Sequence, residues 1–369
     1  MDPILINRIL DLAVDIQQIP APTFHEQQRA RFIGAQFETE GLCDVSVDGP
    51  GNVFGRLPGT GDALPLVVTA HSDTVFPTST HLKAQRETEK IAGPGIGDNS
   101  LGVAGLLGLL WILRQRGISL PGDLWLVANV GEEGLGDLRG MRAVVERFGG
   151  QILAYLILEG MALGQIYHRG LGVRRYRITA QSAGGHSWVD FGRPSAIHEL
   201  AELVTRLAAL PLPSRPRTTL NVGMIGGGTS VNTIAAEAHL ELDLRSEGLR
   251  SLEGLAGRVE SLVWEANRPG VQFSAEVVGQ RPVGKISSSH PLVRLVKRCL
   301  EEQGIRPSLT IGSTDANIPL SLGLPAVCLG LTTGNGAHTV EEYIHTAPLG
   351  QGLEQLVAVV ERAFGELRQ

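Results

Sequence analysis

The stretch "LVVTAHSDTVFP", residues 66–77, decides the predicted fold. Its first five residues, 66–70, are uncharged and mostly apolar, which predicts a buried strand. His71 and Asp73 follow at the end of that strand, and residues two apart on a strand share a face, so both side chains are expected to point into one cleft. Alone, the fragment also fits an ordinary turn, because serine and aspartate are common turn residues.

The composition limits the class of protein. The chain has 369 residues, 43% of them hydrophobic and 19% charged, which is typical of a soluble globular protein of two or three domains. A net charge of -6 without basic runs argues against a nucleic-acid partner. Three widely spaced cysteines favour a reducing compartment, so we expect a cytoplasmic protein. The apolar stretch 101–113 is too short to span a bilayer, and we expect no membrane association.

The first half of the chain alternates between helical patterns and nearly all-apolar strands. This alternation predicts an α/β fold, a three-layer α/β/α domain around a largely parallel sheet. The predicted elements are helices near 3–18, 25–41, 100–116 and 138–148, and strands near 43–48, 52–56, 65–70, 123–130 and 152–158.

The pattern changes near residue 172, where "GVRRYRITAQS" alternates in polarity like a half-exposed antiparallel strand. A compact α+β unit follows, and α/β character returns after "GQRPVG". We therefore expect a catalytic domain of residues 1–172 and 283–369, interrupted by a smaller inserted domain of residues 173–282. The remaining predicted elements are helices near 196–210, 249–267, 290–303 and 349–367, and strands near 218–225, 234–245, 271–278, 308–311 and 326–330.

Carboxylates and imidazoles recur at the predicted strand ends, where ligands bind in open α/β sheets. Each residue alone has an ordinary explanation, such as a helix N-cap or a solvated turn. Together they indicate a metal site, because carboxylates at the ends of apolar strands need a partner. Imidazole and carboxylate ligands without thiolates suit zinc, cobalt or manganese. The residues are His71, Asp73, Asp98, Glu132, Glu133, Glu159 and His338.

Two other chemistries have less support. The segment "GPGIGD", residues 93–98, is similar to the dinucleotide-binding pattern GxGxxG, but Asp98 would repel a pyrophosphate. No serine has glycine at both flanking offsets of the GxSxG pattern, so a serine hydrolase has no motif here.

The ordered motifs resemble a known family, the di-zinc metallopeptidases and deacylases that include peptidase T, aminoacylase and carboxypeptidase G. The resemblance covers essentially the whole chain. Its C-terminal part, "GSTDANIPLSLGLPAVCLGLTTGNGAHTVEEYI", is most similar to the peptidase T-like branch. The motifs that carry the resemblance are "HSDTVFP", "GIGDNSLGVAGLL", "GEEG", "LEG", "SAGGHSW", "VNTIAAEAHLELDLRSE" and "GAHTVEEYI".

The resemblance implies two divalent metal ions in each chain, with zinc as the first choice. His71 and Glu159 would bind one ion, and Glu133 and His338 would bind the other. Asp98 would bridge both ions.

The resemblance also implies roles around the metals. Glu132 would be the general base, which takes a proton from the metal-activated water and passes it to the leaving nitrogen. Asp73 would accept a hydrogen bond from His71 and fix its tautomer. His186 would help to stabilise the oxyanion, although it also fits the plain end of a strand.

The inserted domain would act as a lid and dimerisation domain of a homodimer. Asn232 and Arg245 would contact the substrate there, although Arg245 also fits an ordinary surface ion pair. The chain departs from many relatives at Asn99, which follows Asp98, and at Glu159, where aspartate is common.

The leading hypothesis is a metal-dependent exopeptidase, an aminopeptidase that removes N-terminal residues from short peptides. An N-acyl-amino-acid deacylase or a carboxypeptidase of the same family is the alternative, and its substrate would be an N-acyl amino acid or a peptide. A non-catalytic metal-binding protein is a third reading. It would not need Glu132 beside Glu133, or Asp73 behind His71.

Overall fold

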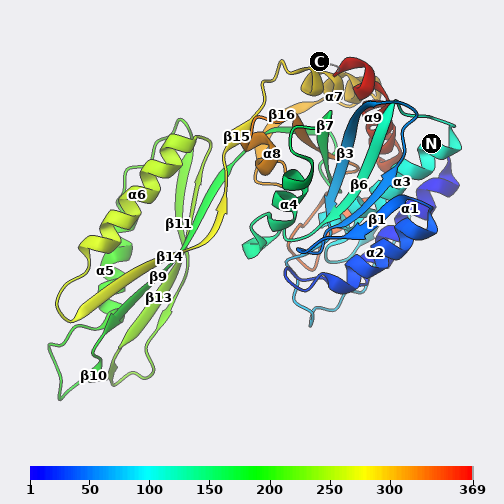
Figure 1. Cartoon of the computed structure of the whole chain (residues 1–369). Helices are drawn as coiled ribbons and strands as arrows, with labels where there is room; N and C mark the ends of the chain where they lie inside the picture. Colours follow the sequence, from blue (N-terminus) through cyan, green and yellow to red (C-terminus); the bar gives the residue numbers. More distant parts are fainter. Residues whose placement is uncertain (368–369) are drawn as a thin grey trace. The chain divides into compact units, whose positions relative to one another are not determined.

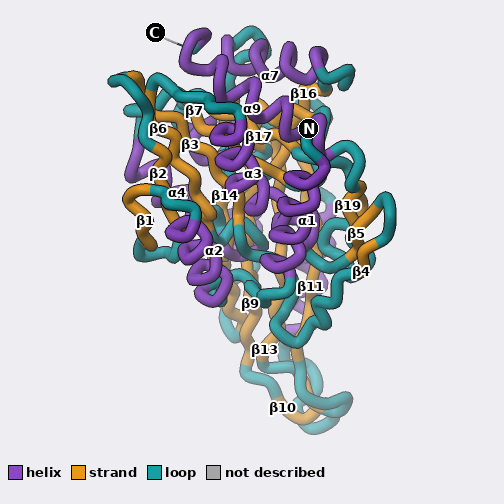
Figure 2. Tube along the Cα trace, turned by 90° about the vertical axis from the view of Figure 1, so that its right-hand side faces the viewer, coloured by secondary structure: helices purple, strands orange, loops and turns teal. Residues whose placement is uncertain are grey.

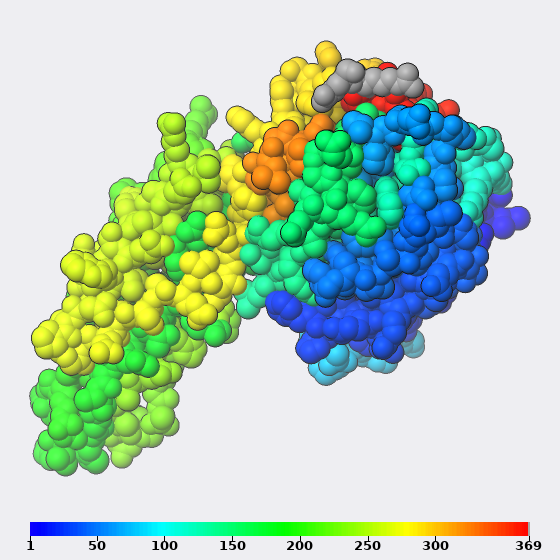
Figure 3. Space-filling model, viewed as in Figure 1, coloured from blue at the N-terminus to red at the C-terminus, as the bar shows by residue number. Residues whose placement is uncertain are grey.

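A computed structural model describes residues 1–367, which form two compact units (Figure 1). The first unit comprises Met1–Gly170 and the chain from Gly284 onward, and the second comprises Leu171–Val283. The insertion expected at residues 173–282 differs from the second unit by two residues at one end and one at the other. Figure 3 shows that both halves of the first unit, coloured blue to green and orange to red, contribute to its surface.

A nine-stranded mixed sheet forms the centre of the first unit. Its strands, from one edge to the other, are β1 (Cys43–Val47), β2 (Val53–Leu57), β6 (Gly122–Asn129), β3 (Ala63–His71), β7 (Ala154–Glu159), β17 (Ala326–Gly330), β8 (Gln165–Gly170) and β15 (Gly284–Lys285), with β16 (Ser308–Gly312) paired to β8. The predicted parallel arrangement holds from β6 to β17. The flanking strands β1, β2 and β15 pair antiparallel, and β8 pairs antiparallel with β17 and β15 but parallel with β16. A short connection such as that between β1 and β2 permits only antiparallel pairing.

Helices cover both faces of this sheet, and the predicted three-layer α/β/α class is confirmed. They are α1 (Pro3–Gln17), α2 (Gln27–Thr39), α3 (Leu101–Gln115), α4 (Arg139–Phe148), α7 (Pro291–Glu302), α8 (Asn317–Ser321) and α9 (Leu349–Glu366). Figure 2 shows α1, α3 and α9 together in front of the strands, where α3 packs against both of the others. The helices α4 and α8 pack against each other on the opposite side.

Helix α3 is the apolar centre of this unit. A kinked turn, Ile96–Ser100, leads into it, and the combined segment Ile96–Gln115 is longer than the apolar stretch predicted from the sequence. Its 20 residues could cross a membrane by length and composition alone, but 94% of its most apolar window is buried inside the structure. Such burial is typical of a core helix.

A second, small sheet joins two loops that lie far apart in the sequence. It consists of β4 (Gln85–Arg86), β5 (Lys90–Ala92), β19 (Tyr343–His345) and β18 (Gly334–Asn335). In its centre β5 pairs antiparallel with β19. The loop that contains Asp98 follows β5, and the loop that contains His338 precedes β19, so this pairing brings both loops to one place.

The second unit has its own sheet and its own hydrophobic core. Helices α5 and α6 pack on the sheet, which confirms the predicted α+β character. The sheet is antiparallel, with the strand order β11-β13-β9-β14. The elements are β9 (Gly172–Ser182), β10 (Gly185–His186), α5 (Ala196–Ala208), β11 (Thr218–Gly227), β12 (Thr233–Ile234), β13 (Glu237–Ser246), α6 (Leu249–Glu265) and β14 (Val271–Arg281).

Candidate metal centre

Polar residues follow the ends of three adjacent parallel strands. His71 is the last residue of β3, and Glu159 is the last residue of β7. Glu132 and Glu133 come shortly after β6, which pairs with β3. The carboxyl ends of parallel strands are the usual place for ligands in α/β sheets. The fold therefore gathers these four side chains at one end of the sheet.

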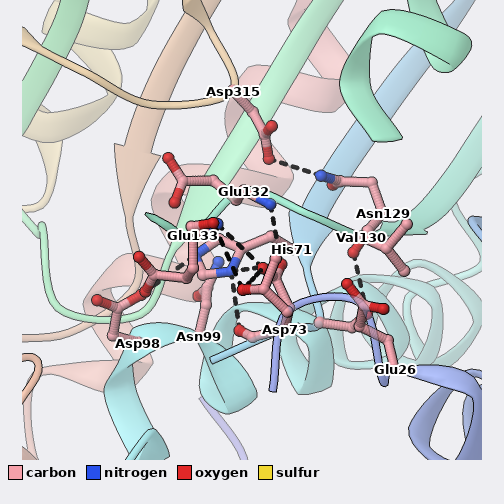
Figure 4. Close-up of polar contacts among 12 residues, drawn as sticks. Glu26, His71, Asp73, Asp98, Asn99, Asn129, Val130, Glu132, Glu133 and Asp315 are labelled. Carbon is pink, nitrogen blue, oxygen red and sulfur yellow. Dashed lines mark hydrogen bonds and ion pairs between the residues drawn. The ribbon is translucent and has the colours of Figure 1, made fainter. Parts of the chain in front are cut away.

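Figure 4 shows Asp98 in the same cluster as His71 and Glu133. Asp98 faces two imidazoles, those of His71 and His338. Its Oδ1 is 3.1 Å from Nε2 of His71, and its Oδ2 is 3.2 Å from Nε2 of His338. His71 Nε2 is also 3.6 Å from Oε2 of Glu159, and His338 Nε2 is 3.1 Å from Oε1 of Glu133. The geometry thus pairs His71 with Glu159 and His338 with Glu133, with one oxygen of Asp98 facing each pair.

This cluster concentrates negative charge in a buried space. Burial raises the pKa of Glu133 and the pKa of Glu159, each to about 7. Burial alone would also raise the pKa of Asp98, but hydrogen bonds with His338 and His71 hold it well below its usual value. Hydrogen bonds with Asp98 and Glu133 raise the pKa of His338 to about 10. Positive charge is therefore strongly favoured among these carboxylates.

His71 shows that a metal ion suits this place. Its Nδ1 lies 3.2 Å from the main-chain oxygen of Asp73 and 3.6 Å from Oδ1 of the same residue, so a neutral ring with its proton on Nδ1 has acceptors for that proton. Nε2 then turns its lone pair toward Asp98 and Glu159, which are acceptors themselves. A cation satisfies all three groups at once. Two imidazoles and three carboxylates without a thiolate fit a pair of zinc, cobalt or manganese ions.

Asp73 is fully buried and does more than face His71. Its Oδ1 accepts a hydrogen bond of 3.0 Å from the main-chain N–H of Glu132, and its Oδ2 accepts one of 3.0 Å from that of Glu133. The hydroxyl of Thr23 donates to Oδ2 at 2.8 Å. Asp73 therefore fixes the backbone of the Glu132–Glu133 pair, and Thr23 is a support that the sequence did not indicate.

Asn99 ties the Asp98 loop to the end of β7. Its amide nitrogen donates to the main-chain oxygen of Leu158 at 2.8 Å, and its Oδ1 accepts from the N–H of Gly160 at 3.0 Å. These two groups flank Glu159. The backbones also approach closely, because a Cβ at Gly160 would lie 2.1 Å from the main-chain oxygen of Gly97. Asn99 thus has a structural role at the end of β7.

Two further buried carboxyl groups, those of Asp315 and Glu342, were not singled out from the sequence. Burial and the charge of Glu132 together raise the pKa of Asp315 to about 8. Asp315 Oδ2 accepts a hydrogen bond of 2.6 Å from Asn129, while its Oδ1 has no partner among the described residues. Glu342 is also fully buried, and burial raises its pKa to about 7. Both lie inside quoted motifs, "GSTDANIPL" and "GAHTVEEYI", but spacing alone gave no reason to single them out.

Within the described part of the chain, the side chains of the three predicted residues of the second unit bond to residues close by in the sequence. His186 is exposed, and its Nδ1 accepts from the N–H of Trp188 at 3.2 Å, so the neutral ring carries its proton on Nε2. Asn232 is exposed and accepts from the hydroxyl of Ser230 at 3.0 Å. Arg245 pairs with Asp243 at 2.7 Å. The structure thus assembles five predicted ligands in the first unit and leaves these three residues in the second.

The fold and the polar cluster together define a metal-dependent hydrolase. The sequence profile of Peptidase family M20/M25/M40 matches residues 67–362, so the chain belongs to this family. The predicted recognition and the enzyme class, a metallopeptidase or amidohydrolase, are confirmed.

The chain is similar to solved structures along its whole length. A tripeptidase from Staphylococcus aureus has a TM-score of 0.82 and 21% identity, with coverage of 98% of this chain and 99% of that one. The aminopeptidase PepT from Bacillus cereus has a TM-score of 0.77 and 24% identity, with coverage of 97% and 98%. The chain is also similar in sequence to succinyl-diaminopimelate desuccinylase from Corynebacterium glutamicum. The two are 26% identical over a match that covers 92% of this chain and 91% of that protein.

Proposed function

We propose that the chain is a metal-dependent aminopeptidase that removes N-terminal residues from short peptides. The observation that carries the proposal is the position of Asp98, with one oxygen facing His71 and the other facing His338. Glu132 follows β6 at the same end of the sheet. This arrangement supports two neighbouring metal ions, with zinc as the first choice and cobalt or manganese as alternatives.

Each residue then has a defined task. When bound, the metal pair polarises the scissile carbonyl and lowers the pKa of the attacking water. Glu132 takes the proton of that water and delivers it to the leaving nitrogen. Asp73 keeps the Glu132–Glu133 backbone in place. His186 offers its Nε2–H to the oxyanion, a role that its Nδ1 hydrogen bond to the N–H of Trp188 supports.

Whether the substrate carries a free α-amino group or an N-acyl group separates this proposal from its alternative. Full-length similarity to an aminopeptidase and to a tripeptidase supports the aminopeptidase. Similarity to a desuccinylase supports an N-acyl-amino-acid deacylase, and a carboxypeptidase uses the same chemistry. We propose that Asn232 and Arg245 contact the substrate. For Arg245 to bind a substrate carboxylate, the guanidinium must exchange or share its contact with Asp243.

The second unit supports a homodimer as part of the proposal. Strand β11 is an outer strand of its sheet and exposes Met224 and Ile225. Trp188 and Phe191 are also largely exposed. A second copy of the chain would cover such apolar side chains. We further propose a cytoplasmic location, which the three free cysteines support.

The first experiment compares a free tripeptide with its N-acetylated form, using zinc-, cobalt- or manganese-loaded enzyme and chelated enzyme as the control. We expect cleavage of the free peptide alone and its loss on chelation. Preference for the acetylated form would move the chain to the deacylase or carboxypeptidase class. Cleavage that survives complete removal of metal would refute the metal-dependent mechanism.

A further inference from the structure

Glu342 is a fully buried carboxyl group whose partners are backbone amides. Its Oε1 accepts hydrogen bonds from the N–H groups of Gly97 at 2.7 Å and of Asp98 at 2.8 Å, and its Oε2 accepts from Gly95 at 2.9 Å. Its main-chain oxygen also accepts from Gly93 at 2.8 Å. Glu342 thus accepts hydrogen bonds from four N–H groups of the loop that follows β5, three through its side chain and one through its main chain. When the carboxyl group is ionised, these hydrogen bonds are stronger than bonds between neutral groups.

The loop held in this way contains the central residue of the metal cluster. The N–H of Asp98 bonds to Glu342, while the two oxygens of Asp98 face His71 and His338. A ligand that serves two metal ions must keep both oxygens in place, because a functional site tolerates displacements of only about 0.5 Å. The contact from Glu342 therefore acts on the residue where a displacement would disturb both ions.

Glu342 also belongs to the loop that supplies another ligand. His338 lies four residues before it, and β19 begins directly after it. The backbone bonds between β19 and β5 continue with the main-chain bond between Glu342 and Gly93. The bonds of the Glu342 carboxylate to Gly95, Gly97 and Asp98 come next. The backbone ladder and the carboxylate thus form one continuous connection between the loops of Asp98 and His338.

We propose that Glu342 is a positioning residue of the metal centre, which fixes Asp98 through three backbone amides and locks the Asp98 loop to the His338 loop. The inference rests on the metal site proposed above. A merely structural role is the competing explanation, in which Glu342 contributes to folding stability alone. The two explanations differ in the metal affinity of a folded variant, since only a positioning role alters it.

The test titrates metal-free protein with Zn²⁺ or Co²⁺ by calorimetry, and records the visible spectrum of the Co²⁺ form, for the native chain, Glu342→Gln and Glu342→Ala. In Glu342→Gln the amide NH2 group faces backbone N–H donors, and in Glu342→Ala all three side-chain contacts are lost. We expect affinity to fall about 10- to 100-fold, as for other groups that orient ligands. The Co²⁺ spectrum should change as well. Glu341→Gln, an exposed neighbour, is the matched control and should bind like the native chain.

The outcomes separate the inference from the function on which it rests. A native chain that binds no metal would refute the proposed function. Native binding together with equal affinity and an unchanged Co²⁺ spectrum in both folded variants would refute the positioning role alone. A lower melting temperature of the metal-free variants with unaltered affinity would assign Glu342 a structural role only. Weaker binding by variants that melt like the native chain supports the proposal.

Discussion

The two units hold their polar side chains in opposite ways. In the first unit Asp73, Asn99 and Glu342 are fully buried, and each bonds to backbone groups of a segment distant in the sequence. In the second unit His186 and Arg245 bond within their own neighbourhood and remain accessible. Buried side-chain contacts between loops fix geometry before a ligand arrives, whereas exposed side chains can adapt to one. The comparison suggests fixed chemistry in the first unit and adaptable substrate recognition in the second.

The sharpest test of fixed chemistry is Glu132→Gln. We expect kcat to fall about 10³-fold, because the amide cannot accept the proton of the attacking water. Metal stoichiometry should stay native, since Glu132 is not one of the five proposed ligands. The measurements are steady-state kinetics and metal analysis of the purified variant.

Glu146→Gln on α4 is the control for this variant, because Glu146 is exposed in the same unit. It should keep native kcat and metal content. Native turnover of Glu132→Gln would remove Glu132 as the base. Loss of metal in that variant would instead make it a ligand and would weaken the distinction between Glu132 and Glu133.

His186→Ala tests the second unit. We expect kcat to fall about 10²-fold, the usual cost of one lost oxyanion donor. Metal affinity and the Co²⁺ spectrum should not change, because the residue lies outside the unit that contains the ligand cluster. His198→Ala on α5 replaces another exposed histidine of this unit and serves as the control. Normal turnover by His186→Ala would show that the oxyanion donor lies elsewhere.

The smallest expected effect is the pH dependence of the metal-free protein. The pKa values of Glu133 and Glu159 are raised from 4.5 to about 7, so the folded chain keeps protons that the unfolded chain loses in this range. The free energy of unfolding should therefore fall as pH rises from about 4.5 to 7. The pKa of His338 is raised from 6.5 to about 10, so this residue lowers the free energy of unfolding as pH rises through that range. Denaturant unfolding of chelated protein at several pH values measures this slope.

Metal binding should reverse this trend, because the metal replaces the bound protons. Calorimetric titrations in buffers of different ionisation enthalpy should therefore detect proton release near pH 6, and metal affinity should increase with pH. A metal affinity that does not depend on pH between 5.5 and 8 would contradict the proposal that Glu133 and Glu159 hold protons in the metal-free protein.

The sequence predicted the layers of the fold because long periodic elements carry their own signal. The strand at 326–330 matches β17, and the apolar helix near 100–116 matches α3 within one residue at each end. The small sheet of β4, β5, β18 and β19 was missed, since strands of two or three residues show no period.

The candidate site was predicted unevenly for a related reason. His71 and Glu159 end apolar strands, where an ionisable group is conspicuous. Glu342 and Asn99 act on backbone groups of distant loops, and no local pattern marks such a contact. The sequence also could not show that Asp243 pairs with Arg245, although an ordinary ion pair was among the expectations for that arginine.

The pairing of β5 with β19 sets the order of events during synthesis of the protein. Asp98 and Glu342 are 244 residues apart, and the whole second unit is translated between them. A ribosome must therefore pass residue 345 before the two metal-binding loops can meet. We expect nascent chains that are stalled before His338 to bind no metal tightly, so that tight metal binding must await synthesis of the His338 loop and of β19.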